Sequence, residues 1–353
     1  MKKMKRDNET GWMDAAFYPL KKLTRFLGEK IYDFRVWLHG KIPHSQKQAT
    51  VSVKRRKEAI FYYSLLAFPL LQFLIFYVGV NINSILLSFK DYRVDAGGNG
   101  YIWVGMTNYI QFFKDFFYGS TLKEIALNSL TVYGGGLLIG FPLAIMFSFY
   151  LYKNFPLTNL FKVLLFLPSV ISSVVMVLMY KFFVDRGVTA IIEAMFHVKI
   201  SPPLATSATR FGWIIFYNLF ICYGTNVIMY TSSMTRIPPS LIEYARLEGA
   251  GYFNELFRIV IPLIFPTITT FLVVGVAGIF TNQAYVYTFY AVSAPVDVTT
   301  FGYFLFGKVI AGRTTLAEYP YASAAGIIFT FIAVPLTMAV KYLLEKFGPS
   351  SEF

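Results

Sequence analysis

Six apolar runs, each close to the ~20 residues that cross a bilayer as a helix, dominate the sequence after position 58. Inside lipid a backbone must satisfy its own hydrogen bonds, and runs of this length do so as helices. A hydrophobic content of 56% with only 14% charged residues agrees with this interpretation. The sequence therefore predicts an all-α polytopic membrane protein with six transmembrane helices. We place the spans at 60–80, 125–151, 163–184, 211–234, 260–280 and 322–342.

The positive charge of the chain is concentrated before the first span. Residues 1–58 hold 15 of the 32 lysines and arginines, and the cluster at 54–57 abuts the first apolar run. Cytoplasmic flanks of membrane spans carry such an excess, which explains the net charge of +13 better than binding to nucleic acid does. With six spans, both termini are then cytoplasmic. We divide the chain into a basic N-terminal extension (1–57), a permease domain (58–345) and a cytoplasmic tail (346–353).

The N-terminal extension carries apolar residues at helical spacing among lysines and arginines between positions 12 and 38. This pattern predicts an amphipathic cytoplasmic helix. Two placements remain open for it, the surface of the bilayer and the base of the protein itself.

Reactive side chains are scarce in the apolar runs. The three histidines lie outside the runs, and the single cysteine, Cys222, is expected to be a small buried packing residue. No Asp or Glu lies in the centre of a span, and Lys181 lies near an outer end, where it can extend toward water. These features disfavour a metal site, a proton- or sodium-coupled carrier and a membrane hydrolase, so we expect neither an enzyme nor a metal.

Small residues and prolines punctuate the spans. Gly136, Gly140 and Ala144 recur at every fourth position, a spacing that lets transmembrane helices pack closely. Pro168 and other prolines within the runs predict bent helices. The loops at 90–124 and 185–210 are expected outside, and the first of them carries aromatic residues typical of a membrane interface: Tyr101, Trp103, Tyr109 and Phe112.

One apparent nucleotide-binding motif is rejected. Gly302, Gly307 and Lys308 match the first part of a phosphate-binding loop, but Val309 occupies the position where Ser or Thr coordinates magnesium. We therefore expect no cofactor bound directly to this chain. If ATP powers it, another subunit hydrolyses the ATP.

A polar, punctuated segment separates the fourth and fifth spans on the cytoplasmic side. Pro239 suits a first helical position, residues 240–248 can form about two helical turns, and Gly249 begins a break. Pro262 then marks the start of the fifth span. The segment predicts a short helix, a bend and a second helix.

This segment resembles the EAA loop of ABC-importer permeases. The family pattern is Glu-Ala-Ala, then Gly four residues later, then Ile-x-Leu-Pro after nine more. Here Glu243, Tyr244 and Ala245 are followed by Gly249 and by Ile-Val-Ile-Pro ending at Pro262, with every spacing kept. Tyr244 replaces the first Ala. Further segments, 103–109, 166–168 and 319–326, are similar to permeases that import carbohydrates, particularly oligosaccharides.

The resemblance implies a coupling helix that docks on a separate ATPase, whose hydrolysis of ATP-Mg alternates access through the membrane. It implies a heterodimer with a second permease subunit, two ATPase subunits, an extracellular solute-binding protein and a bacterial-type plasma membrane. It assigns the coupling role to Glu243, Tyr244, Ala245, Arg246, Glu248, Gly249 and Pro262.

A sugar is neutral and rich in hydroxyls, so its passage calls for amides and aromatic rings rather than charges. The fourth span and the end of the fifth carry such groups. We predict that the path is lined by Tyr217, Asn218, Tyr223, Thr225, Asn226, Asn282, Gln283, Tyr285 and Tyr287. Buried Asn and Tyr also bond neighbouring helices, so packing is the alternative role. Another solute such as glycerol phosphate or polyamine, and a self-contained carrier, are the alternative functions.

Overall fold

The computed structural model describes residues 53–95, 98–312 and 316–349, and it divides into two units, residues 1–71 and 72–353. The N-terminal extension predicted to be amphipathic lies outside the described residues except for its last few positions. Those positions begin helix α2 (Val53–Gln72). Its apolar side chains are exposed on every side, as in a helix made to face lipid or another apolar surface.

The second unit begins with a helix and a small hairpin. A π-helical turn, η1 (Phe73–Gly79), leads into α3 (Val80–Ser88). Strands β1 (Lys90–Asp95) and β2 (Gly98–Trp103) then pair antiparallel, and α4 (Thr107–Tyr118) follows. The chain is therefore mostly helical but not purely α, and residues 90–124 are more ordered than the predicted loop. Tyr92 and Tyr101 face each other across the two strands, with their rings edge-to-face at 5.2 Å, a cross-strand contact that stabilises the hairpin.

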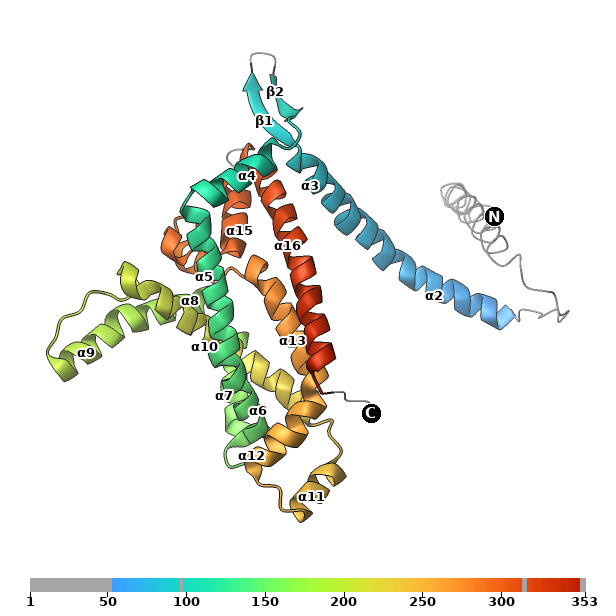
Figure 1. Ribbon diagram of the computed structural model, residues 1–353, viewed down its shortest axis with the longest axis vertical. Helices are drawn as coiled ribbons and strands as arrows, with labels where there is room; N and C mark the ends of the chain where they lie inside the picture. Colours follow the sequence, from blue (N-terminus) through green and yellow to red (C-terminus); the bar gives the residue numbers. More distant parts are fainter. Residues whose placement is uncertain (1–52, 96–97, 313–315, 350–353) are drawn as a thin grey trace, which may run out of the picture. The chain divides into compact units, whose positions relative to one another are not determined.

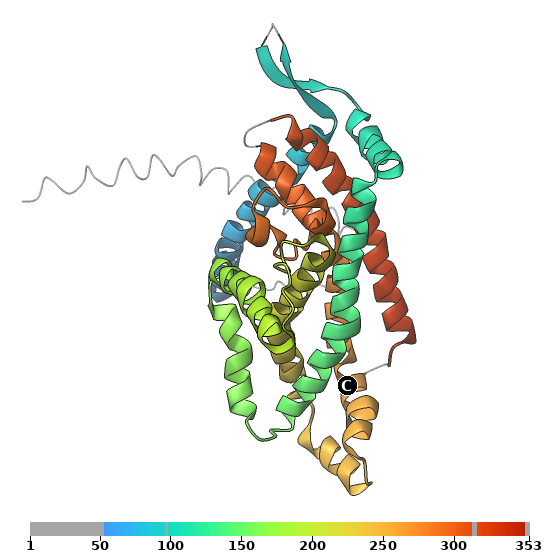
Figure 2. The ribbon, with the colours of Figure 1, turned by 90° about the vertical axis from the view of Figure 1, so that its left-hand side faces the viewer.

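The remaining elements are helical. Those up to Met234 are α5 (Thr121–Gly135), η2 (Gly136–Gly140), α6 (Phe141–Tyr152), α7 (Thr158–Val170), α8 (Ser173–Phe182), η3 (Phe183–Val188), α9 (Thr189–Phe196) and α10 (Ser207–Met234). Those after Met234 are α11 (Pro239–Leu247), α12 (Tyr252–Glu255), η4 (Leu256–Val260), α13 (Ile261–Thr281), α14 (Val286–Tyr290), η5 (Val296–Val298), α15 (Phe301–Gly312) and α16 (Glu318–Phe347). Within the second unit, the hairpin and α11 lie at opposite ends in both views (Figures 1 and 2).

Among the described residues, five helices are long and apolar enough to cross a membrane, and a sixth candidate is a bent pair. The third predicted span, 163–184, falls on this pair and is not one continuous helix, because α7 and the helix from Ser173 to Phe196 meet at 103°. Ile171 and Ser172 have extended backbones, with ψ of 142° and 130°, and they break the helix three residues after Pro168. A proline kink was expected, but two extended residues could not be inferred from composition.

One further expectation for a single side chain is wrong. Phe112 is not at an interface: it is 3% exposed and packs against Phe329 at 5.6 Å between ring centroids. Lys181 is partly exposed at the end of α8, where its Nζ donates to the Phe289 carbonyl at 3.0 Å and lies over the Tyr290 ring. Phe112 thereby joins α4 to α16, and Lys181 joins α8 to α14.

Candidate functional site

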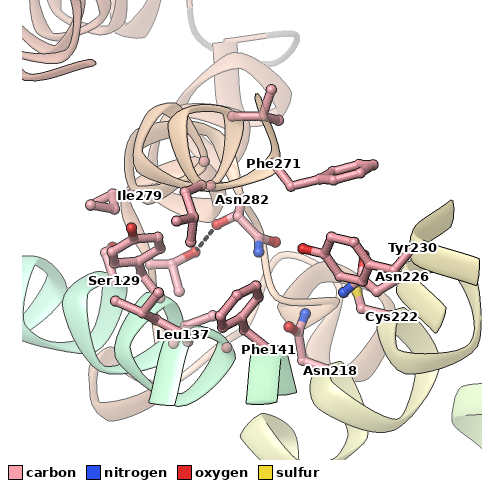
Figure 3. A pocket seen from close by; sticks show the side chains of 18 residues that line it. Ser129, Leu137, Phe141, Asn218, Cys222, Asn226, Tyr230, Phe271, Ile279 and Asn282 are labelled. Carbon is pink, nitrogen blue, oxygen red and sulfur yellow. Dashed lines mark hydrogen bonds between the residues drawn. The ribbon is translucent and has the colours of Figure 1, made fainter. Parts of the chain in front are cut away.

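A cavity of about 430 Å³ lies among α5, η2, α6, α10 and α13 (Figure 3). Asparagines contribute its amides and four rings, Tyr133, Phe141, Tyr230 and Phe271, contribute aromatic surface. Among the lining residues that the structure describes, none carries a charge. The cavity is thus a place for a neutral group that offers hydroxyls and apolar faces.

Helix α10 presents one polar face to this cavity. Asn218, Cys222 and Asn226 are four residues apart, so they lie above one another along the helix (Figure 3). Asn282 approaches from the end of α13. The structure therefore brings together three of the predicted lining residues, Asn218, Asn226 and Asn282. It corrects the role of Cys222, which is exposed in the chain and lines the cavity instead of being packed away.

Hydrogen bonds fix the end of the cavity at which α13 ends. Thr300 donates from Oγ1 to the Asn282 carbonyl at 2.8 Å, and the Asn282 side-chain oxygen accepts from the Ala284 N–H at 2.8 Å. Ser129 Oγ accepts from the Phe301 N–H at 2.8 Å. The segment after α13 is thereby fixed to α5, which leaves the Asn282 NH2 group available on the cavity side.

A second cavity of about 340 Å³ lies at the break between α7 and α8 and shares Cys222 and Asn226 with the first. Tyr217, Thr225 and Tyr285 line it. Tyr217 is 1% exposed, and its hydroxyl has no hydrogen-bond partner among the described residues. Its ring packs edge-to-face on Tyr285 at 5.3 Å, so these two predicted residues meet each other as well as the cavity.

Three predicted lining residues lie elsewhere. Tyr223 packs toward α6 with its hydroxyl 3.4 Å from the Leu143 carbonyl, and the Tyr287 ring contacts Phe306 at 4.8 Å. The main-chain carbonyl of Gln283 accepts a hydrogen bond from the Val286 N–H at 2.9 Å, in the turn that leads into α14. Neither cavity is lined by them.

Several of the lining residues that sequence reasoning missed come from α5 and η2. Ser129, Tyr133 and Gly136 recur at helical spacing and face the first cavity. Gly136 has open space where a Cβ would lie, whereas Gly140 has Leu219 at 3.2 Å and Ala144 is fully buried. Of the three small residues, Gly140 and Ala144 therefore serve close packing, whereas Gly136 leaves space in the cavity. Their regular spacing alone could not distinguish these two roles.

The segment between α10 and α13 has the predicted helix, bend and helix. Helix α11 begins at Pro239, and Gly249 follows it with φ of +82°, a conformation that disfavours a Cβ. Pro262 lies in the first turn of α13, where its missing N–H costs little. Tyr244 and Leu247 are 69% and 83% exposed, and Glu243, Arg246 and Glu248 are exposed beside them, while Ile242 is buried against the helices above. The buried Ile242 therefore fixes α11 to the rest of the protein, while the apolar and charged side chains on its other face stay exposed.

The apparent phosphate-binding motif has a structural explanation. Gly302 and Gly307 both lie in α15, so a helix joins them and not the open loop that would wrap around a phosphate. A Cβ on Gly302 would lie 2.4 Å from the Thr281 carbonyl oxygen, so close packing on α13 requires this glycine. Lys308 pairs with Glu318 at 2.8 Å.

A family model described as the binding-protein-dependent transport system inner membrane component matches residues 136–350. The chain belongs to this family. The match covers the second cavity, the α11 segment and the lining of the first cavity from Gly136 onward. It confirms the predicted ABC-importer permease in a multi-pass inner-membrane setting.

Curated relatives match most of the chain, and several of them are named as a transport system permease. The sn-glycerol-3-phosphate transport system permease protein UgpA of Yersinia pestis bv. Antiqua is 26% identical over 255 residues, covering 72% of this chain and 84% of the relative. Protein LplB of Bacillus subtilis is 26% identical over 301 residues, covering 82% and 90%. A bacterial ABC transporter that imports the acidic polysaccharide alginate has the same fold, with a TM-score of 0.70 and 21% identity over 83% of this chain and 98% of the other.

Proposed function

We propose that the chain forms part of the translocation path for a neutral sugar, an oligosaccharide, in an ATP-driven importer. The observation that carries this proposal is the uncharged cavity with Asn218, Asn226 and Asn282 beside aromatic rings. Amides donate to and accept from sugar hydroxyls, and rings pack on the apolar faces of pyranoses. Two adjoining cavities that share Asn226 suit a solute longer than one sugar unit.

Glycerol phosphate is the second candidate, because relatives from Yersinia are named for it. A phosphate binds best to arginine, lysine or a cluster of N–H groups. The described lining residues offer amides and hydroxyls without a cation, which favours the sugar. A polyamine would call for carboxylates, and the same residues offer none.

Power comes, in this proposal, from a separate ATPase that binds ATP-Mg and docks on α11. Its surface of Tyr244, Leu247, Glu243 and Arg246 combines apolar area with charge, as contact surfaces between subunits do. A second permease subunit, two ATPase subunits and an external solute-binding protein complete the complex. The solved alginate importer was determined with a periplasmic protein bound to alginate pentasaccharide, which supports the last of these partners.

Both termini and α11 are cytoplasmic in the proposed orientation, and the hairpin is outside. The single native cysteine makes this testable, since Cys222→Ala leaves a background without thiols. In that background Arg93→Cys is expected to react with a membrane-impermeant maleimide added outside intact cells, and Leu247→Cys only after permeabilisation. The reverse pattern would invert the orientation.

The sugar proposal is tested by binding of a solute panel to the cognate solute-binding protein. Calorimetry should detect at least one neutral oligosaccharide at micromolar affinity or tighter, with glycerol phosphate and polyamines much weaker. Tight binding of glycerol phosphate alone would replace the proposed solute by the second candidate and leave the ATPase coupling untouched.

A further inference from the structure

A buried ion pair joins two cytoplasmic segments that are far apart in sequence. Lys153, directly after α6, contacts both carboxylate oxygens of Glu255, the last residue of α12. The side chains are 9% and 3% exposed. Arg246 of α11 lies 3.9 Å from the same carboxylate. The pair therefore connects the turn between α6 and α7 to the segment that contains α11.

Burying such a pair brings little net stability, because removing two charges from water costs about as much as their attraction returns. Loss of one partner is expensive, since the other is then left buried and alone. A buried pair of this kind fixes geometry more than it adds stability. Here the geometry that it fixes is the position of the α6–α7 turn on α12.

Aromatic packing reinforces the same junction. Tyr252, in α12, packs on Phe149 at 4.7 Å and on Phe155 of the turn at 5.9 Å. Lys153 also lies over the Phe149 ring at 5.3 Å. Phe149 is fully buried, so the junction continues into the apolar core of the helices above.

The α6–α7 turn is short and conformationally constrained. Asn154 and Leu157 have φ of 52° and 64°, which are unusual for residues with a Cβ. The Tyr150 hydroxyl donates to the Pro156 carbonyl at 2.5 Å and closes the turn on α6. Because the α6–α7 turn is fixed to α6 and to α12, we expect a displacement of α12 to move the turn as a unit and not to be absorbed by bending within it.

Helix α7, which leaves this turn, lies in close contact with α10. A Cβ on Gly224 would be 2.1 Å from the Leu165 carbonyl oxygen, so the two backbones touch. Pro168 at the end of α7 lines the second cavity together with Asn226 of α10. A displacement of α7 therefore reaches the cavities directly.

We propose that the Lys153–Glu255 pair is a strut that carries motion of α11 to α7 and so to the cavities. Lys153 and Glu255 are positioning residues: they touch neither solute nor nucleotide. The inference rests on the proposed docking of an ATPase on α11. It adds a second mechanical connection, through the α6–α7 turn, to the direct one from α11 through α12 into α13.

The test measures solute taken up per ATP hydrolysed by the complete complex in proteoliposomes. Lys153→Met combined with Glu255→Gln removes both charges and leaves no lone buried ion. We expect this double variant to be present in the membrane at the wild-type amount and to support the same rate of ATP hydrolysis. The solute taken up per ATP should fall about two- to thirtyfold, the range typical when a residue that couples two sites is lost. Lys153→Arg keeps the pair and is expected to keep the ratio.

A second variant does not touch the pair. One glycine inserted between Asn154 and Phe155, both exposed in the turn, loosens the connection while the ion pair stays. The same drop in ratio is expected. If the double variant or the insertion variant assembles into the complex and keeps the wild-type uptake per ATP, the proposed role of the ion pair is wrong.

The matched control removes an exposed pair with the same substitutions, Lys341→Met with Glu345→Gln in α16, and is expected to leave the ratio unchanged. Gly249→Pro is measured alongside. If Gly249→Pro lowers the uptake per ATP and the Lys153–Glu255 and glycine-insertion variants do not, the proposed role of the ion pair is wrong and the docking role of α11 stands. If Gly249→Pro also transports normally, the proposed docking itself has failed.

Discussion

Gly224 shows how a single residue sets the distance between two helices. The missing Cβ lets α10 touch the α7 backbone at Leu165, next to the cavity residues Cys222 and Asn226. A glycine inside a helix normally weakens it by about 1 kcal/mol relative to alanine, so its presence here reflects the close approach.

Gly224→Ala is therefore expected to lower the apparent unfolding temperature of the detergent-solubilised complex. Overpacking costs about 1–3 kcal/mol, more than the gain in helix propensity. Gly212→Ala is the control in the same helix, because a Cβ there meets nothing within 4 Å. It should leave the temperature unchanged or raise it, and equal behaviour of the two variants would contradict the close contact.

Asn218 and Tyr223 were both predicted to line the path, and the structure separates them. Asn218 faces the first cavity, whereas Tyr223 packs toward α6. Asn218→Leu is expected to raise the solute concentration for half-maximal uptake about two- to tenfold through the loss of one hydrogen bond to solute. Tyr223→Phe should not change it. A larger effect from Tyr223→Phe than from Asn218→Leu would remove the cavity from the path.

The element that the sequence predicted best is the segment of α11 and α12, since Pro239, Gly249 and Pro262 each fix a local conformation. The long spans followed from hydropathy in the same way. The break at Ile171 and Ser172 did not, because both residues also fit a continuous apolar helix. The junction of Lys153 with Glu255 depends on tertiary contact over 102 positions, which no local pattern reports.

Helix α11 and its bend carry the element-scale prediction. Gly249→Pro cannot adopt φ of +82°, because the proline ring holds φ near −65°. We expect it, and Glu243→Lys, to leave the protein in the membrane and ATP hydrolysis measurable but to abolish ATP-dependent uptake. Gly251→Ala is the control, since Gly251 has φ of −74° and open space for a Cβ. Normal uptake by Gly249→Pro would argue against a coupling role for the bend.

At the scale of the whole molecule, the fold separates the cavities among the helices from the exposed surface of α11. The chain supplies helices and cavities, and α11 offers a surface beyond the apolar spans at the end of the second unit opposite the hairpin (Figure 2). The alginate importer shares this fold, so the fold alone does not choose the solute. In the proposed function, selection among solutes comes from the cavity side chains and from the solute-binding protein that delivers the solute.

ATP-driven accumulation of labelled solute inside proteoliposomes tests the central claim most directly. The complete complex, with its binding protein outside and ATP enclosed, is predicted to accumulate a neutral oligosaccharide and to stop doing so when ATP is replaced by a non-hydrolysable analogue. Accumulation that continues without hydrolysis, or that occurs for glycerol phosphate and for no oligosaccharide, would contradict the account.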